Sequence, residues 1–201
     1  MGCGECYARL LAVWVRRFDV ASLILINGAP GSGKSTLARL LIDEQPLVLL
    51  LDIDSVRRHL GQWDSDPQAA GIAARRLVVA MIRTHLDAGL DVIVPQFLFR
   101  SAFIEELERT AADAGGSFVE IALVSSPEEA TARFAARASS DDPNHQDAVR
   151  LQQSAGARPI EELYSEMIGM LQHERPRTRF VESIPGDIEG TLGRVRSAID
   201  G

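Results

Sequence analysis

Residues 28–35 read GAPGSGKS, which fits the pattern G-x-x-x-x-G-K-S at every fixed position. A short aliphatic run at residues 22–27 precedes this loop, and residues 34–44 carry leucines at helical spacing. A strand, a glycine-rich loop and a helix in this order aim backbone N–H groups and the positive end of a helix at one point. The loop is therefore predicted to hold the polyphosphate of a nucleotide.

The residues of this loop have distinct predicted roles. Gly28, Gly31 and Gly33 keep Cβ atoms away from the phosphates. Lys34 is expected to reach the β- and γ-phosphates, and the Ser35 hydroxyl to bind Mg²⁺. ATP is expected rather than GTP, because no Asn-Lys-x-Asp motif for guanine occurs. The predicted nucleotide-binding residues are Gly28, Ala29, Pro30, Gly31, Ser32, Gly33, Lys34, Ser35, Thr36 and Arg133.

Aliphatic and helical patterns alternate along the rest of the chain. This order predicts an α/β domain over residues 22–201, with a five-stranded parallel sheet and helices on both faces. Strands are expected at 22–27, 47–53, 91–94, 118–124 and 178–183. Helices are expected at 34–44, 67–88, 102–114, 126–138, 159–173 and 187–199. In such sheets the ligand lies at the carboxyl ends of the strands.

Charge and hydropathy exclude several classes of partner. The net charge of −7 over 201 residues argues against a nucleic-acid partner, which needs a basic face. The longest apolar runs are too short to cross a bilayer, and no secretory signal is evident. We therefore expect a cytoplasmic monomer or homodimer without a membrane partner. Residues 1–21 are predicted to be an N-terminal extension, with Cys3 and Cys6 as unpaired thiols.

A second group of polar residues follows the next aliphatic run, where residues 52–57 read DIDSVR. On an extended chain, Asp52 and Asp54 point to the same side. One carboxylate would support Mg²⁺, and the other would accept a proton from an attacking hydroxyl. Arg57 would bind a phosphate or carboxylate of the phosphate acceptor. The alternative is an aspartate that only caps the following helix.

Together, GAPGSGKST and LDIDSVR resemble the corresponding motifs of the P-loop kinases of small molecules. These include the zeta-toxin and chloramphenicol phosphotransferase group, adenylylsulfate kinase and gluconate kinase. The resemblance extends from about residue 22 to the last helix and implies the P-loop NTPase fold. It also implies that Asp54 is the general base, that Asp52 or Asp54 lies near Mg²⁺, and that Arg57 lines the acceptor site.

The third and fourth predicted strands lack the carboxylate that a standard Walker B motif has at its end, since they continue as Val-Pro-Gln and Val-Ser-Ser. The metal-side carboxylate is therefore expected within residues 52–54, which favours kinases over motor or switch ATPases. Gln96 and Arg100 are predicted to face the acceptor, with Gln96 bonding a hydroxyl. The alternative for Arg100 is a solvated loop charge.

Arg133 and Arg137 lie one helical turn apart, ahead of a polar segment that also contains Arg150. In kinases of this kind such a helix ends in a mobile lid, here expected at about residues 138–158, whose arginines close on the phosphates. Arg137 is the predicted catalytic arginine. The alternative is a solvated helix face that pairs with acids such as Glu129.

Two further segments are weaker candidates. Residues 184–187 (IPGD) resemble the segment that borders the adenine in these kinases, although a turn followed by a helix cap explains them equally well. Trp63, Phe97 and Phe99 could form an aromatic wall for the acceptor, but large apolar side chains are more often part of a core.

The sequence as a whole predicts a Mg²⁺–ATP-dependent phosphotransferase. The acceptor would be a hydroxyl of a small molecule, such as an antibiotic, a nucleoside or nucleotide, or a sugar derivative. The alternative is a nucleotide-binding regulator with slow ATPase activity and no small-molecule acceptor.

Overall fold

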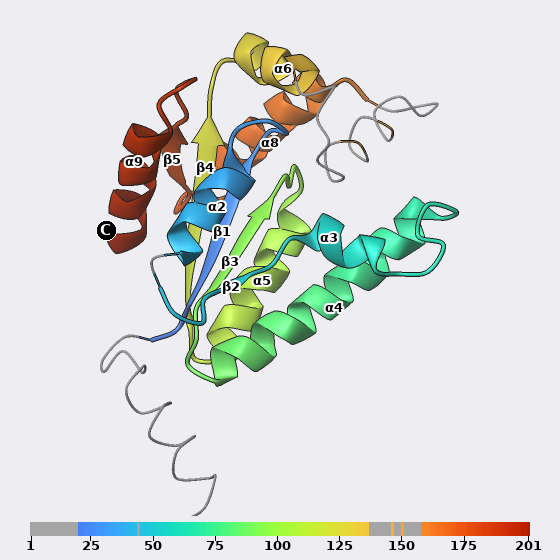
Figure 1. Ribbon diagram of the computed structural model, residues 1–201, viewed down its shortest axis with the longest axis vertical. Helices are drawn as coiled ribbons and strands as arrows, with labels where there is room; N and C mark the ends of the chain where they lie inside the picture. The colour runs from blue at the N-terminus through green and yellow to red at the C-terminus, as the bar shows by residue number, and fades with distance from the viewer. Residues whose placement is uncertain (1–19, 44, 137–145, 147–149, 151–157) are drawn as a thin grey trace, which may run out of the picture.

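The computed structural model describes residues 20–43, 45–136, 146, 150 and 158–201. The predicted strands and helices follow one another in the predicted order, and a short helix that was not predicted follows the second strand (Figure 1). The strands are β1 (Ser22–Gly28), β2 (Leu49–Leu50), β3 (Val92–Gln96), β4 (Ser117–Val124) and β5 (Arg179–Glu182). The helices are α2 (Lys34–Ile42), α3 (Ile53–Arg58), α4 (Pro67–Asp87), α5 (Ser101–Asp113), α6 (Pro127–Ala136), α8 (Ile160–Glu174) and α9 (Ile188–Asp200).

The strands form one parallel sheet in the order β2-β3-β1-β4-β5, which confirms the predicted five-stranded parallel sheet. β1 lies at the centre, where Leu25 is paired with Val94 of β3 and Ile26 with Ile121 of β4. A central parallel strand is covered on both faces, which explains why β1 reads as an uninterrupted aliphatic run.

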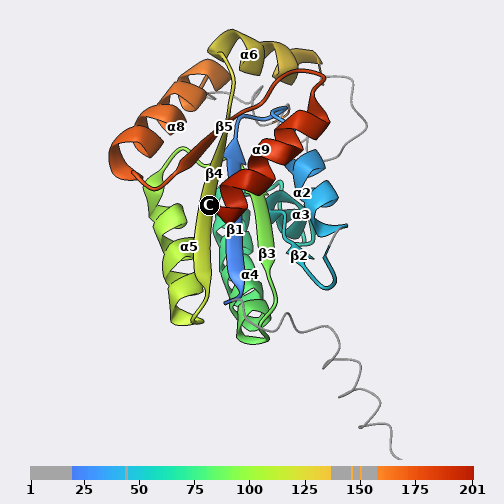
Figure 2. The same cartoon turned by 90° about the vertical axis from the view of Figure 1, so that its left-hand side faces the viewer.

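Each face of the sheet has its own apolar core. Leu23 and Leu25 of β1 join the cluster that includes side chains of α4, α5 and α8, whereas Ile24 and Ile26 join the cluster that includes α2 and α9. This alternation follows from the two-residue period of a strand. The two clusters together confirm that helices cover both faces of the sheet, and Figure 2 shows α2 and α9 together on one side of β1.

The second strand is shorter than predicted. The sequence indicated a strand over 47–53, but only Leu49–Leu50 is paired. Leu47 has a left-handed φ of 61°, which interrupts the extended conformation before the strand. At the other end, Asp52 Oδ1 accepts from the N–H groups of Asp54 and Ser55 at 2.9 and 3.3 Å and begins α3. The helix cap therefore replaces the extended chain predicted for Asp52 and Asp54.

Other boundaries agree closely with the prediction. A capping box begins α6, since Ser126 N donates to Glu129 Oε2 and Glu129 N donates to Ser126 Oγ, both at 3.1 Å. β3 continues through Pro95 to Gln96 instead of ending at Val94. The predicted N-terminal extension lies almost entirely outside the described residues, as does most of the predicted lid. None of the helices within the described ranges could cross a bilayer.

The carboxyl ends of β1, β3, β4 and β5 meet at one edge of the sheet (Figure 1). The loops that follow these strands are residues 29–33, 97–100, 125–126 and 183–187. Helix α6 lies over this edge and is packed against α8 in both views. The predicted motifs therefore converge on this edge.

Candidate phosphate and acceptor site

The loop between β1 and α2 has the shape of an anion cradle. Gly31 and Gly33 have φ values of 87° and 90°, which residues other than glycine rarely adopt. Ser32 N donates to Ala29 O at 3.1 Å, which closes a tight turn. The Ser32 hydroxyl oxygen is buried and has no hydrogen-bond partner within the described part of the chain. These features fit the polyphosphate that the sequence predicts for this loop.

Lys34 is the chain's single lysine and opens α2 directly under this cradle. Its side chain is largely buried, at 8% exposure, and Nζ donates to Ala29 O at 2.7 Å. The ammonium group is thus held against the loop backbone, within the turn that would surround a phosphate. A buried ammonium group attracts a phosphate more strongly than a surface arginine does, because water screens it less.

Asn27 fixes the start of the loop, a role that was not predicted from the sequence. Its side chain is fully buried, and Oδ1 accepts from Gly28 N at 2.8 Å and from Leu98 N at 2.9 Å. Nδ2 donates to Leu98 O at 2.9 Å. These bonds tie the phosphate loop to the segment after β3. The available signal was a polar residue that ends an aliphatic run directly before the first glycine.

Ser35 and Asp52 line one cavity of about 220 Å³ beside the loop. Burial, and then the nearby Asp54 charge, raises the pKa of the Asp52 carboxyl above its ordinary value. A hydroxyl and a carboxylate are hard oxygen donors that suit Mg²⁺, which usually keeps several waters and phosphate oxygens. No group of three or more His, Cys, Asp or Glu side chains among the described residues could hold a metal ion by itself. A cation here would therefore be shared with a bound phosphate.

Asp54 lies on the first turn of α3 and is held by two neighbours. Arg57 Nη1 is 3.2 Å from Asp54 Oδ1, and Gln96 Nε2 donates to Asp54 Oδ2 at 3.2 Å. The carboxylate remains 35% exposed, so it is oriented yet accessible. Arg57 Nε and Gln96 Oε1 are both buried without a partner in the described chain, so each of the two side chains that hold Asp54 keeps one unpaired polar atom. Three of the predicted acceptor-site residues are thus brought together.

The aromatic residues divide between this site and the core. Trp63 is half-buried, and the Arg57 guanidinium lies 4.9 Å from its ring centre, a cation–π contact that fixes the arginine. The ring centres of Phe97 and Phe99 are 5.8 Å apart, and both rings are packed against the larger core. Trp63 therefore borders the candidate acceptor site through Arg57, whereas the two phenylalanines fit the core alternative.

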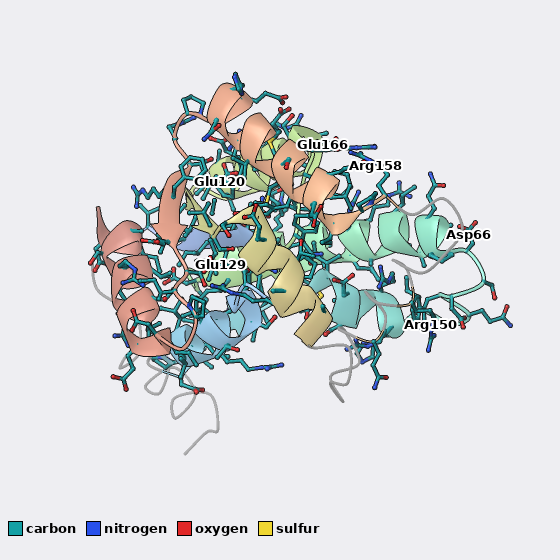
Figure 3. All side chains as sticks on the ribbon, turned by 90° about the horizontal axis from the view of Figure 1, so that it is seen from above. Asp66, Glu120, Glu129, Arg150, Arg158 and Glu166 are labelled. Atoms are coloured by element: carbon teal, nitrogen blue, oxygen red, sulfur yellow. The ribbon has the colours of Figure 1, made fainter. Side chains whose placement is uncertain are left out.

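Among the residues that the structure describes, Arg133 is paired with Ser183 and not with Glu129 or another acid. Nη1 donates to Ser183 Oγ at 3.0 Å, and Nη2 donates to Ser183 O at 2.6 Å. Within that part of the chain, Arg133 therefore does not form the pair with Glu129 expected for a solvated helix face. Arg137, the predicted catalytic arginine, lies outside the described residues, as does most of the lid segment at 138–158. Arg150 is described, and it is exposed (Figure 3).

A cavity of about 310 Å³ extends from the phosphate loop to the turn after β5. Thr36, Leu37 and Arg133 form one part of its wall, and residues 183–188 form another. The predicted adenine-bordering segment 184–187 thus adjoins the phosphate loop. Asp187 also caps α9 by accepting from Gly190 N at 2.9 Å, so the alternative interpretation as a helix cap holds as well.

Arg100 is not brought to Asp54. It occupies the N-cap position of α5, is exposed, and lies 5.6 Å from the Phe99 ring centre. It lines a separate cavity of about 470 Å³ between α5 and α8, where Glu166 is paired with Arg158 (Figure 3). This placement favours a solvated loop charge over acceptor binding.

A family model described as an AAA domain matches residues 23–160. No curated protein sequence matches the chain. Among solved structures, a gluconokinase from Sinorhizobium meliloti 1021 has a TM-score of 0.59 at 16% identity, over 91% of this chain and 94% of that one.

Two other solved structures are similar to the same extent. APS kinase of Mycobacterium tuberculosis, in complex with AMPPNP and APS, has a TM-score of 0.59 at 18% identity and covers 92% of this chain and 100% of its own. The tunicamycin resistance protein of Deinococcus radiodurans has a TM-score of 0.59 at 15% identity, with coverages of 89% and 95%. At these identities the likeness is one of fold, and it confirms the predicted P-loop NTPase fold and the resemblance to small-molecule kinases at that level.

Proposed function

This chain belongs to the AAA domain family, and from that premise we propose that it is an ATP-dependent phosphotransferase. It would move the γ-phosphate of ATP to a hydroxyl group of a small molecule. The phosphate cradle accounts for nucleotide binding alone, which a regulatory protein would share. The assignment as a phosphotransferase therefore depends on a group that can act on an acceptor.

Asp54 is the observation that carries the proposal. Its carboxylate is partly exposed at the carboxyl edge of the sheet, and Arg57 and Gln96 hold it by bonds of 3.2 Å. A general base must keep one oriented oxygen within reach of the hydroxyl that it deprotonates. Simple ATP hydrolysis does not need a carboxylate flanked by a free donor and a free acceptor. A polyhydroxylated acceptor would use all three groups.

In the proposed reaction, Asp54 accepts the proton of the acceptor hydroxyl while the hydroxyl oxygen forms a bond to the γ-phosphorus. The bond from that phosphorus to the β–γ bridging oxygen breaks, and ADP leaves with the electron pair. Lys34 and the amides of the loop balance the negative charge that moves to the leaving group. Ser35 and Asp52 would hold Mg²⁺, which supplies further charge neutralisation when bound.

The acceptor is expected to carry a polar group besides its reacting hydroxyl. Arg57 Nε is a buried donor, and Gln96 Oε1 is a buried acceptor. Neither atom has a hydrogen-bond partner in the described chain. A carbonyl, carboxylate or phosphate oxygen would satisfy Arg57, while a second hydroxyl would satisfy Gln96. Sugar derivatives, nucleosides and hydroxylated antibiotics have this combination of groups. Arg137 stays the proposed catalytic arginine of the lid.

The test is a search for acceptor-dependent turnover. The full chain is incubated with Mg²⁺–ATP and a panel of sugar derivatives, nucleosides, nucleotides and hydroxylated antibiotics, and the products are followed by ADP release and mass spectrometry. At least one compound is expected to gain a phosphoryl group and to raise ADP release above the basal rate. Basal hydrolysis that no compound raises would support the regulator instead.

A further inference from the structure

Ser183 directly follows β5, and its polar groups together bond three other elements of the site: β4, α6 and the phosphate loop. Its N–H donates to Val124 O at the end of β4, at 2.8 Å. Its carbonyl accepts from Arg133 Nη2 of α6 at 2.6 Å. Its hydroxyl accepts from Arg133 Nη1 at 3.0 Å and donates to Ser32 O of the phosphate loop at 3.0 Å. The residue is 93% buried, since its exposed fraction is only 7%.

The direction of these bonds is fixed by chemistry. A carbonyl oxygen such as that of Ser32 only accepts, and a guanidinium such as that of Arg133 only donates. The Ser183 hydroxyl is the one group in this chain of bonds that can do both. It therefore connects the phosphate loop to α6, two segments about a hundred residues apart in the sequence.

A second contact joins the same two elements. A Cβ built on Gly31 would lie 3.2 Å from the backbone carbonyl carbon and oxygen of Arg133. The phosphate loop is thus packed directly against the backbone of α6, with no room for another side chain. The hydrogen bonds through Ser183 and this backbone contact act at the same interface, so a shift of α6 would disturb the loop.

We propose that Ser183 is a positioning residue that couples the conformation of the phosphate loop to helix α6 through Arg133. Ser183 accepts one N–H from each Nη atom of Arg133 and thereby holds this arginine in the wall of the cavity that extends from the phosphate loop. A loop that is already held in its binding conformation loses less entropy when it binds. The consequence for nucleotide affinity depends on the proposed function, whereas the coupling itself does not.

Hydrogen–deuterium exchange on the nucleotide-free full chain tests the coupling without any assumption about activity. Ser183→Ala removes the bridging hydroxyl and is expected to increase deuterium uptake at both residues 28–36 and residues 127–136. Ser183→Thr keeps a hydroxyl and should retain the wild-type uptake. Ser117→Ala is the matched control, because it removes a hydroxyl that bonds Ser22 Oγ at 2.9 Å at the opposite end of the sheet.

Arg133→Ala should raise uptake in the same two segments, and the double variant should add little to either single change. Uptake in Ser183→Ala that matches the wild type, or that rises only around residues 179–187, would overturn the coupling. Global loss of stability is separated from the local effect by the uptake of core strands, which should not change.

Steady-state kinetics test whether the coupling affects nucleotide binding. Ser183→Ala is expected to raise KM for ATP by roughly fivefold to tenfold, because the phosphate loop loses the bond that holds Ser32 O, while KM for the acceptor is retained. An equal loss in both KM values, or a loss of kcat alone, contradicts a role in positioning the phosphate loop. A wild-type protein that phosphorylates no acceptor would contradict the proposed function, and the exchange experiment would still decide the coupling.

Discussion

Gln96 Nε2 donates to Asp54 Oδ2 across 3.2 Å, and this bond joins the last residue of β3 to the first turn of α3. Two segments that are 42 residues apart thereby share one reactive group. Gln96 is paired with Asn27 of the central strand β1, and this pairing holds the end of β3 in the sheet. It gives the carboxylate on the short helix α3 a fixed direction.

Gln96→Ala should therefore lower acceptor-dependent kcat by about tenfold, because a misdirected base reaches the hydroxyl less often. Gln96→Glu should lower kcat further, since it replaces the amide that donates to Asp54 with a second negative charge that repels the Asp54 carboxylate. ATP affinity, measured by calorimetry, should not change, and Gln68→Ala on the exposed start of α4 serves as the control.

Asp52→Asn should separate stability from metal binding. Burial raises the pKa of the Asp52 carboxyl, so the folded state binds the proton more tightly than the unfolded state does. The stability that this proton provides is present at low pH and is lost as pH rises through the raised pKa. At about pH 7 the ionised group thus opposes folding.

Asparagine removes this charge and keeps an oxygen that can cap α3. Denaturant unfolding is expected to show Asp52→Asn at least as stable as the wild type at about pH 7, with the difference reduced near pH 4. Asp52→Ala loses the cap and should be about 1 kcal/mol less stable than Asp52→Asn. Both variants should lose Mg²⁺-dependent ATP affinity. Retained Mg²⁺ dependence would contradict the metal role of Asp52.

Gly31→Ala and Gly33→Ala form a matched pair in the phosphate loop. Both glycines have φ near 90°, but a Cβ on Gly33 meets no atom within 4 Å, whereas one on Gly31 meets the Arg133 backbone at 3.2 Å. Gly33→Ala should cost about 1–2 kcal/mol from backbone conformation alone. Thermal unfolding without nucleotide should show that Gly31→Ala lowers the melting temperature more than Gly33→Ala does. Equal losses would mean that α6 moves away from the loop without cost.

Arg175 balances a buried carboxylate far from the site. Its Nε lies 2.9 Å from Glu120 Oε2 and its Nη2 lies 2.7 Å from Glu108 Oε2, while Glu120 itself is only 4% exposed. Burial raises the pKa of the Glu120 carboxyl, and the bond to Arg175 opposes that rise.

Arg175→Ala should cost about 3 kcal/mol in denaturant unfolding at neutral pH, because Glu120 is left buried without its cation. The loss should shrink at acidic pH, where Glu120 takes up a proton. Adding Glu120→Gln to Arg175→Ala should recover part of the stability. A double variant as unstable as Arg175→Ala would show that the lost packing of Arg175 matters more than the charge.

The sequence predicted the order of strands and helices well because its signals there are local. The aliphatic run of β1, the glycines of the phosphate loop and the capping box at Ser126 each act within a few residues. The second strand was predicted too long because Leu47–Ile53 is uniformly aliphatic except for Asp52. Apolar character alone did not reveal the left-handed Leu47 or the competition from a helix cap at Asp52.

The structure brings together three of the four residues predicted for the acceptor site, Asp54, Arg57 and Gln96, whereas Arg100 lies elsewhere. The sequence could not show that Arg57 and Gln96 both hold Asp54. Asn27 and Ser183 escaped notice because single polar residues at strand ends are common and bond partners about 70 and 150 positions away. Long-range hydrogen bonds of this kind leave no periodic pattern in a sequence.

The ratio of acceptor-dependent to basal ADP release, compared between the wild type and Asp54→Asn, tests phosphoryl transfer onto a small molecule most directly. Asparagine keeps the shape of the side chain but cannot accept the proton, so acceptor-dependent release should fall by about a hundredfold or more. ATP affinity should stay within about twofold of the wild type, and Asp64→Asn, an exposed change in the following loop, should have no effect. Acceptor-dependent turnover that survives Asp54→Asn unchanged would contradict this account.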